Sequence, residues 1–267
     1  MCRVCGLTMV LAVAVCMGAA AQEAKPWEQP GTAAGQEIVG PDGGVMVWVP
    51  AGEFLMGSND GRQVERPQRK VALDGFWMHK HEVTVAQYRK FCEGTSRHLP
   101  VLGADWRGQD DHPIVLVDWR LASAYAEWAG LSLPTEAQWE KAARGTDGRT
   151  YPWGDTWDAA KCASRNSTGT KLKWSRPVGS YPAGASPYGC LDMAGNAWEW
   201  CADRYLADYY AEAPLANPLG PVSGDRRVVR GGSWNDVDAS YFRCADRRAG
   251  GTRYRDNRIG FRCAKSL

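Results

Sequence analysis

Residues 189–203 constrain the fold of this chain more than any other segment. They include two carboxylates, Asp192 and Glu199, and Glu199 is the centre of a Trp-Glu-Trp triplet. Gly195 and Asn196 lie between the carboxylates, and both residue types tolerate left-handed backbone, which lets carbonyl groups turn inward. Carboxylate and carbonyl oxygens are the ligands that calcium prefers in proteins. The segment therefore predicts either a calcium loop or a tight turn with two solvated carboxylates before a buried strand.

The amino-acid composition favours a loop-rich domain held together by large aromatic side chains. The chain has 267 residues, which suits one large domain or two small ones, and neither an internal repeat nor a second domain is evident. It contains 13 Trp and 30 Gly, a combination more typical of turns packed around buried rings than of long helices. The formal net charge of +2 gives no electrostatic reason to expect nucleic acid as a partner.

Residues 1–21 are predicted to form a secretory signal peptide. Arg3 supplies the positive charge ahead of the apolar stretch 7–17, which is too short to span a bilayer. Ala-Ala-Ala at 19–21 resembles a signal-peptidase site. A lipid anchor on Cys16 is the alternative, although valine precedes this cysteine where a small residue would be expected. We therefore expect a periplasmic or secreted protein, with no membrane contact once the signal peptide is removed.

The segment that follows the signal peptide is predicted to be a linker. Residues 22–43 mix Pro, Gly, Ala, Gln and Glu without apolar periodicity, which is typical of disordered chain. The folded domain is then expected to occupy residues 44–267.

A possible pair of metal ligands follows a predicted strand. The stretch 71–78 has the composition of a β-strand. If this strand continues, His79 and His81 lie on the same face, and a His-x-His pair can bind a metal ion. The alternative is two partly exposed strand residues with no ligand.

Three short helices are predicted from their N-terminal residues. Thr84 and Thr135 each precede a glutamine by three positions, which is the pattern of a capping box. Asp118 is a further N-cap residue, and apolar side chains follow it at helical spacing. The aromatic residues of these helices are expected in the core rather than around a cofactor.

The cysteine content predicts disulfides. Three of the nine cysteines lie in the predicted signal peptide, and six remain in the expected mature chain. An even number of cysteines in an oxidising compartment favours disulfides, although the sequence does not choose their pairing. No Cys-x-x-Cys pair remains, so a zinc or redox motif is not expected. The six are Cys92, Cys162, Cys190, Cys201, Cys244 and Cys263.

Five motifs resemble, in the same order, those of the sulfatase-modifying-factor family, whose founding members are formylglycine-generating enzymes. The motifs are Val-Pro-Ala-Gly-Glu-Phe-Leu-Met-Gly at 49–57, Leu-Pro-Thr-Glu-Ala-Gln-Trp-Glu at 133–140, Gly-Asn-Ala-Trp-Glu-Trp at 195–200, Arg-Gly-Gly-Ser-Trp at 230–234 and Gly-Phe-Arg-Cys at 260–263. They extend over nearly the whole expected mature chain. The resemblance implies an α+β, C-type-lectin-like fold that is loop-rich, with short helices and small antiparallel sheets.

The resemblance also implies structural calcium. It gives Asp192 and Glu199 as side-chain ligands, and Gly195 and Ala197 as carbonyl ligands. Many relatives bind another calcium ion near the position of Asn166. Here Asn166 is present, but residues 168–174 contain no carboxylate, so the resemblance leaves a calcium site at Asn166 open.

The segment that holds the family's catalytic cysteines has changed in this chain. Formylglycine-generating enzymes oxidise a substrate cysteine with oxygen, and two cysteines soon after their Gly-Gly-Ser motif bind copper(I). Here the first position is Asp236 and the second falls near Ala239 and Ser240. Because a carboxylate is a poor ligand for copper(I), we expect no copper site. The resemblance still implies a ligand-binding cleft lined by Trp198, Arg230, Ser233, Trp234 and Asp236.

Arginine alternates with aspartate in the stretch 236–258. This alternation predicts either ion-pair networks or a basic pocket for an anionic substrate. The two interpretations cannot be separated from the order of residues alone.

Three functions remain open at this stage. The first is an exported maturation or modification factor of this family that acts without the copper–cysteine site. The second is a calcium-stabilised, C-type-lectin-like binding module, and the third is a formylglycine-generating oxidase with a rearranged site. The sequence leaves open whether the chain is an enzyme, and whether its substrate is a protein, a peptide or a small molecule.

Overall fold

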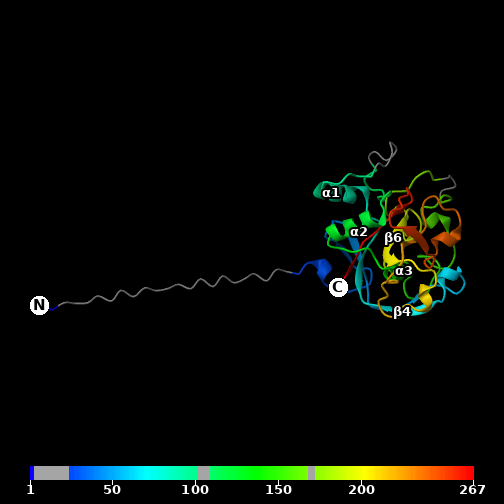
Figure 1. Ribbon diagram of the computed structural model, residues 1–267, viewed down its shortest axis with the longest axis horizontal. Coiled ribbons are helices and arrows are strands. Elements are labelled where there is room, and N and C mark those ends of the chain that lie inside the picture. Colours follow the sequence, from blue (N-terminus) through cyan, green and yellow to red (C-terminus); the bar gives the residue numbers. More distant parts are fainter. Residues whose placement is uncertain (3–23, 101–108, 168–171) are drawn as a thin grey trace.

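The computed structural model describes residues 1–2, 24–100, 109–167 and 172–267, in which short strands and helices are joined by long loops (Figure 1). The α-helices are α1 (Val85–Thr95), α2 (Trp119–Trp128) and α3 (Glu136–Arg144). The strands are β1 (Glu37–Val39), β2 (Val45–Val49), β3 (Gly52–Met56), β4 (Arg69–Leu73), β5 (Phe76–His79), β6 (Trp198–Arg204), β7 (Arg226–Arg230), β8 (Arg248–Gly251), β9 (Ile259–Gly260) and β10 (Ala264–Ser266). The fold is therefore α+β and rich in loops, as predicted.

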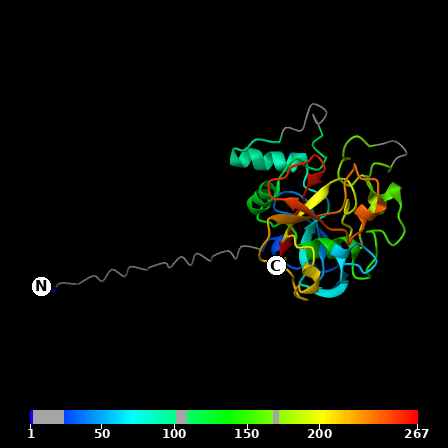
Figure 2. The same cartoon turned by 45° about the vertical axis from the view of Figure 1, so that its right-hand side comes forward.

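One sheet joins the two ends of the domain. Its strands follow the order β1-β2-β5-β10, and every neighbouring pair is antiparallel. Because the C-terminal strand β10 pairs with β5, the C-terminus lies beside the N-terminal elements, as both ribbon views show (Figure 2). A separate hairpin is formed by β3 and β4.

Part of the predicted linker is a strand of this sheet, which corrects the expectation of disorder over residues 22–43. Glu37–Val39 forms β1 and pairs with β2. Just before β1, the Gly35 N–H donates to the Trp48 carbonyl, and the Trp48 N–H donates to the Gln36 carbonyl, both at 2.9 Å. Composition predicted disorder because the segment has few apolar side chains, whereas backbone hydrogen bonds at a sheet edge do not depend on side-chain type.

A second sheet brings three of the family motifs side by side. Its strand order is β8-β7-β6-β9, and β6 contains the Trp-Glu-Trp triplet. Strand β6 pairs antiparallel with β7 and parallel with β9. In this register Glu199 lies opposite Arg230 on one side and opposite Gly260 on the other. The Trp-Glu-Trp, Arg-Gly-Gly-Ser and Gly-Phe-Arg-Cys motifs therefore meet in one sheet.

The three predicted helices are confirmed, and each begins at its predicted cap. The hydroxyl groups of Thr84 and Thr135 accept hydrogen bonds from the backbone N–H of the glutamine three residues later, at 3.3 and 3.1 Å. The Asp118 carboxylate accepts one from the backbone at the start of α2, at 3.1 Å. Tyr88 and Tyr125 are in the core as expected: they are 1% and 0% exposed, and their ring centroids lie 5.7 Å apart. Trp128 at the end of α2 was also expected in the core, but it is 41% exposed.

Buried ion pairs fix α3 against the second sheet. Arg247 donates to Glu136 through two nitrogens at 2.7 and 2.8 Å. On the next turn of α3, Glu140 accepts from Arg144 at 2.7 Å and also from Arg230. All five side chains are 2% exposed or less. The ion-pair interpretation of the arginine-rich C-terminal stretch therefore holds for Arg247.

The structure contains no disulfide among the described residues, contrary to the prediction. All six cysteines of the expected mature chain are free and buried. They are divided among separate parts of the core: Cys92 and Cys263 in one cluster, Cys190, Cys201 and Cys244 in a second, and Cys162 in a third. Burial raises the pKa of Cys162 and of Cys244 to about 12. The even count was misleading because cysteine also packs in cores as a small apolar side chain.

The predicted signal peptide falls almost entirely within residues 3–23, which lie outside the described part of the structure. In the residues that are described, no helix has the length and apolar character needed to cross a membrane.

Candidate functional site

The loop that begins at Asp192 has the left-handed backbone that its sequence predicted. Asp192 and Asn196 have φ angles of 57° and 62°, and Gly195 has a φ of 85°. A Cβ atom on Gly195 would lie 2.3 Å from the carbonyl oxygen of Ala163, so only glycine fits at this position. The loop leads directly into β6 and so places its carboxylates at the start of the second sheet.

Glu199 is fully buried, and both of its carboxylate oxygens have partners. Arg262 donates to Oε2 through Nε and to Oε1 through Nη2, each at 2.7 Å. The indole N–H of Trp139 donates to Oε2 at 2.8 Å. A bidentate guanidinium–carboxylate pair is a strong, charge-assisted contact. Glu199 would therefore have to share its carboxylate between Arg262 and a bound calcium ion.

Glu82 is a third carboxyl group near this loop, and no sequence motif pointed to it. It is 0% exposed, and its Oε1 atom has no hydrogen-bond partner among the described residues. Burial, together with the neighbouring carboxylate of Asp192, raises the pKa of Glu82 well above its ordinary value. Burial also raises the pKa of Asp192 to about 6. The guanidinium of Arg262 bonds to Glu199, and its positive charge lowers the pKa of Glu82 and of Asp192, whereas the burial of these two carboxyl groups raises it.

The other candidate metal ligands form no cluster of their own. Asn166 is exposed and lies just before residues 168–171, which are outside the described part. His79 Nε2 lies 3.3 Å from a carboxylate oxygen of Asp42, and His81 Nδ1 lies 3.3 Å from the carbonyl of the next residue. In the described residues, no group of three or more His, Cys, Asp and Glu side chains could hold a metal ion. A cation at the 192 loop would therefore need backbone carbonyl ligands as well.

Asp236 is held by three hydrogen bonds beside the second sheet. Ser233 donates to Asp236 Oδ2 through its backbone N–H at 2.9 Å and through its hydroxyl at 2.7 Å. Trp198 donates its indole N–H to the same oxygen at 2.9 Å. The structure therefore brings three of the five predicted cleft residues into direct contact.

A cavity of about 250 Å³ opens beside this contact. The residues that line it are Trp198, Val229, Asp236, Tyr241, Arg248, Arg258 and Ile259. The ring centroids of Trp198 and Tyr241 are 6.4 Å apart and give the cavity an aromatic side. Such a volume is below that of pockets that hold drug-sized ligands, so it suits a group of about the size of one amino acid.

Arg248, Arg258 and Tyr241 line the cavity, but they were not among the residues predicted to do so. The sequence feature that could have identified the two arginines was the alternation of arginine and aspartate in the stretch 236–258. Arg248 Nε lies 3.1 Å from Asp246, and Arg258 Nε lies 2.7 Å from Asp256. These arginines are ion-paired and also border the cavity, so the two interpretations of the alternation were not exclusive.

The two remaining predicted cleft residues lie elsewhere, which corrects the expectation from the family resemblance. Arg230 is fully buried, and it donates to the carbonyl of Ala245 at 2.9 Å as well as to Glu140. Trp234 is 7% exposed, and its indole N–H donates to the carbonyl of Asn257 at 3.2 Å. Neither lines the cavity, and neither does Ser233, which is buried behind Asp236 and reaches the site only through its hydrogen bonds to that carboxylate. Arg230 is the last residue of β7, and the next three residues separate it from Trp234.

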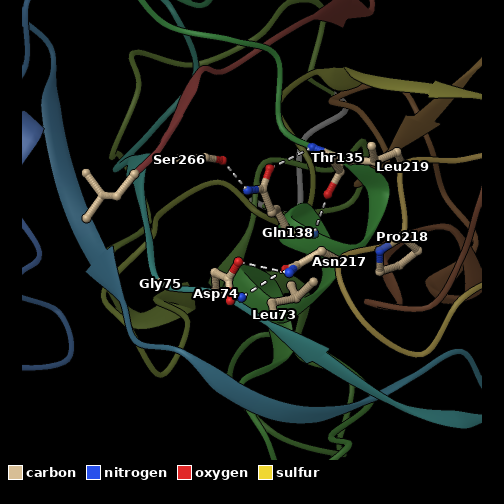
Figure 3. A pocket seen from close by; sticks show the side chains of 10 residues that line it. Leu73, Asp74, Gly75, Thr135, Gln138, Asn217, Pro218, Leu219 and Ser266 are labelled. Atoms are coloured by element: carbon tan, nitrogen blue, oxygen red, sulfur yellow. Dashed lines mark hydrogen bonds between the residues drawn. The ribbon is translucent and has the colours of Figure 1, made fainter.

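Two further cavities lie along the loop 205–225. The larger is about 610 Å³ and is lined mainly by this loop. The smaller, of about 200 Å³, is shown in Figure 3. Its polar side chains bond to one another: Gln138 donates to Ser266 and Asn217 donates to Asp74, each at 2.9 Å. These groups are already satisfied, so the cavity of Figure 3 offers no evident acid, base or nucleophile.

The loop-rich α+β fold and the cavity beside the Gly-Gly-Ser turn define a C-type-lectin-like protein of the formylglycine-generating-enzyme type. Residues 34–267 match the Sulfatase-modifying factor enzyme 1-like domain. The chain belongs to this family.

Curated relatives are similar over most of this chain. It is 34% identical over 281 residues to the formylglycine-generating enzyme of Bos taurus, covering 82% of this chain and 74% of that protein. It is 34% identical over 315 residues to the formylglycine-generating enzyme of Streptomyces coelicolor, covering 95% and 96%. It is also 39% identical over 243 residues to the serine/threonine-protein kinase Pkn1 of Chlamydia trachomatis, covering 83% of this chain but 38% of that protein. The chain thus spans well under half of this kinase.

Solved structures share the fold. PvdO from Pseudomonas aeruginosa has a TM-score of 0.77 and 24% identity, covering 89% of this chain and 100% of that chain. Treponema denticola variable protein 1 has a TM-score of 0.69 and 23% identity, covering 83% and 95%. At these identities the similarity establishes the fold alone.

Proposed function

We propose that this protein is a maturation or modification factor of the sulfatase-modifying-factor family that acts without the copper–cysteine site of formylglycine-generating enzymes. The observation that carries the proposal is Asp236, a carboxylate at the first cysteine position. Three donors hold its Oδ2 atom in place. Among the described residues that line the cavity there is no cysteine.

The nearest cysteine along the chain gives no substitute for the missing pair. Cys244 is fully buried, and burial raises its pKa to about 12, so its thiol stays protonated. Copper(I) binds thiolates, which form at low-pKa and accessible cysteines. This supports a binding or modification role that does not depend on oxygen activation by copper.

The chemistry available at the cavity is that of a fixed hydrogen-bond acceptor. All three donors converge on Oδ2 of Asp236, and no described residue donates to Oδ1. An ionised carboxylate accepts at both oxygens, so Oδ1 can receive a hydroxyl or ammonium group. We expect the ligand to present such a group to Asp236 and to pack its apolar part on the aromatic side formed by Trp198 and Tyr241.

Ethanolamine, which carries both a hydroxyl and an ammonium group, is a suitable probe of this acceptor. The indole N–H of Trp198 bonds to Asp236, so its NMR resonance should shift saturably as ethanolamine is added. In Asp236→Ala the titration should leave the Trp198 resonance unmoved, because the acceptor is absent. Asp225→Ala is the matched control, since Asp225 is exposed and does not line the cavity, and it should respond as the wild type does. An equal response in Asp236→Ala would refute the assignment.

Export is part of the same proposal. It is supported by the charge at Arg3, the apolar stretch 7–17 and the small residues at 19–21. The expected location is the periplasm or the exterior of the cell.

A calcium-stabilised binding module is the second candidate, and the buried carboxyl cluster favours it. Asp192, Glu82 and Glu199 are three buried carboxyl groups, Arg262 pairs with Glu199 alone, and Glu82 Oε1 has no partner among the described residues. We propose that a calcium ion is held by Asp192, by the carbonyls of Gly195 and Ala197, and by Glu199. Such an ion would rigidify the loop without taking part in chemistry.

Removal of calcium is expected to lower the melting temperature. An ion that binds only the folded state adds about 2.7 kcal/mol when its concentration is a hundredfold above Kd. A chelator should remove this contribution from the wild type, and Asp192→Ala should melt at the same temperature with or without chelator. Asp60→Ala, at an exposed position, should keep the wild-type response. A wild-type melting curve that the chelator leaves unchanged would show that no calcium is bound.

A further inference from the structure

Two arginines border the cavity that contains Trp198 and Asp236. The side chains of Arg248 and Arg258 are 31% and 37% exposed, so both reach solvent at the cavity. Their carboxylate partners are less exposed: Asp246 at 0% and Asp256 at 15%. Each guanidinium is thus anchored on its inner side and open on its outer side.

Both guanidinium groups keep unused donors. Arg258 donates to Asp256 through Nε and Nη2, each at 2.7 Å, and Arg248 donates to Asp246 through Nε at 3.1 Å. An arginine has five N–H donors in a rigid planar fork, so donors remain on each of them for a ligand. Arg248 is held further by Tyr241, whose ring centroid lies 4.5 Å from its Cζ atom. The two groups are therefore preorganised, which lowers the entropy cost of binding.

The ion pairs alone do not account for the position of these arginines. Asp246 is also paired with Arg62 at 3.0 Å. Asp256 also accepts from the hydroxyl of Tyr254 at 2.8 Å and from the backbone N–H of Arg258 at 2.9 Å. Asp246 and Asp256 therefore each have a hydrogen-bond partner other than the side chain of Arg248 or Arg258. Pairing with these carboxylates does not explain why both arginines border the cavity.

We propose that Arg248 and Arg258 bind an oxyanion of the ligand, a carboxylate or a phosphate, at this cavity. Two guanidinium groups and one carboxylate, that of Asp236, line the cavity, while Asp246 and Asp256, which pair with the arginines, do not line it, so the donors that face the cavity suit an anion. A guanidinium fork matches the geometry of both carboxylate and phosphate. The inference rests on the proposed function and narrows its ligand: a small group with an oxyanion at one end, and a hydroxyl or ammonium group that reaches Asp236.

The test uses inorganic phosphate and acetate as probes, with acetamide as the uncharged match of acetate. The Trp198 indole N–H resonance of the full-length protein reports binding. Phosphate or acetate should shift it saturably, and acetamide should not. The oxyanion that saturates at the lower concentration identifies the preferred ligand chemistry.

Substitutions then assign the binding to the two arginines. Arg258→Gln should weaken the binding of the preferred anion at least tenfold, and Arg248→Gln should do the same. Arg258→Lys keeps the charge but not the fork and should weaken binding less. Arg253→Gln is the matched control, because Arg253 lies in the same segment, is exposed and does not line the cavity. Its affinity should equal that of the wild type.

Folding is checked by the melting temperature and by the unchanged NMR spectrum away from the cavity. Arg258→Gln is the safer variant in this respect, because Asp256 keeps Tyr254 as a partner. The proposal is overturned if acetamide shifts Trp198 as acetate does, if neither anion shifts it, or if Arg248→Gln and Arg258→Gln both bind as the wild type does.

A failure of the anion site can be told apart from a failure of the acceptor role proposed for Asp236. If phosphate binding depends on the arginines but ethanolamine binding does not depend on Asp236, the anion site stands and the acceptor role fails. If the ethanolamine response requires Asp236 but the arginine variants bind anions normally, the acceptor role stands and the anion site is refuted.

Discussion

Glu140→Ala is expected to lower the free energy of unfolding by about 3–5 kcal/mol. Glu140 is 0% exposed, and it accepts from Arg144 and from the Gly57 N–H, each at 2.7 Å, as well as from Arg230. Without the carboxylate, two buried guanidinium groups lose a charged partner that no water can replace. Chemical denaturation followed by tryptophan fluorescence measures the loss.

Two further variants make this prediction specific. Glu127→Ala removes a glutamate from the exposed side of α2 and should change stability by no more than about 0.5 kcal/mol. Glu140→Gln keeps an acceptor without the charge and should fall between the two alanine variants. A loss in Glu140→Ala no larger than in Glu127→Ala would mean that the network does not depend on this carboxylate.

The protein is expected not to convert cysteine to formylglycine at a rate near that of an enzyme of its family. The peptide substrate would be Cys-x-Pro-x-Arg, supplied with copper and oxygen, and conversion is followed as a loss of peptide mass. Loss of a group that takes part in chemistry commonly slows a reaction by about 10³-fold or more, because the remaining pocket can only bind and orient. The family motifs predict that Asp236 occupies the first cysteine position, and a carboxylate cannot supply a thiolate.

The formylglycine-generating enzyme of Streptomyces coelicolor is the positive control for this assay, since it is 34% identical over 95% of this chain. Asp236→Cys should remain inactive, because the segment near Ala239 and Ser240 supplies no second cysteine. Turnover by the wild type at a rate close to that of the control would instead favour an oxidase with a rearranged site.

Several features of this protein were predictable because they depend on short stretches of chain. The capping boxes at Thr84 and Thr135 are satisfied within four residues, so the starts of α1 and α3 needed no tertiary information. The left-handed backbone at Gly195 and Asn196 follows equally from local residue preference. The five ordered motifs were sufficient to indicate the family and its fold.

Features that depend on two distant segments were missed or mistaken. Composition suggested a disordered linker, yet β1 is ordered by hydrogen bonds to β2. The even number of cysteines suggested disulfides, yet the six cysteines are free and are divided among three clusters of the core. The order of β1 and the state of the cysteines both depend on which distant residues lie beside them. Composition and cysteine count do not identify those residues.

The candidate site shows the same division. From the sequence, the family motifs predicted that Asp236 occupies the first cysteine position and that Trp198 and Ser233 belong to the same cleft. Only the tertiary structure decided that Arg262 takes both oxygens of Glu199, that Arg230 is in the core and that Arg248 and Arg258 border the cavity. The physical reason is that the partner of a charged side chain is set by which strands lie side by side, and the pairing of β6 with β7 and β9 joins segments far apart in the chain.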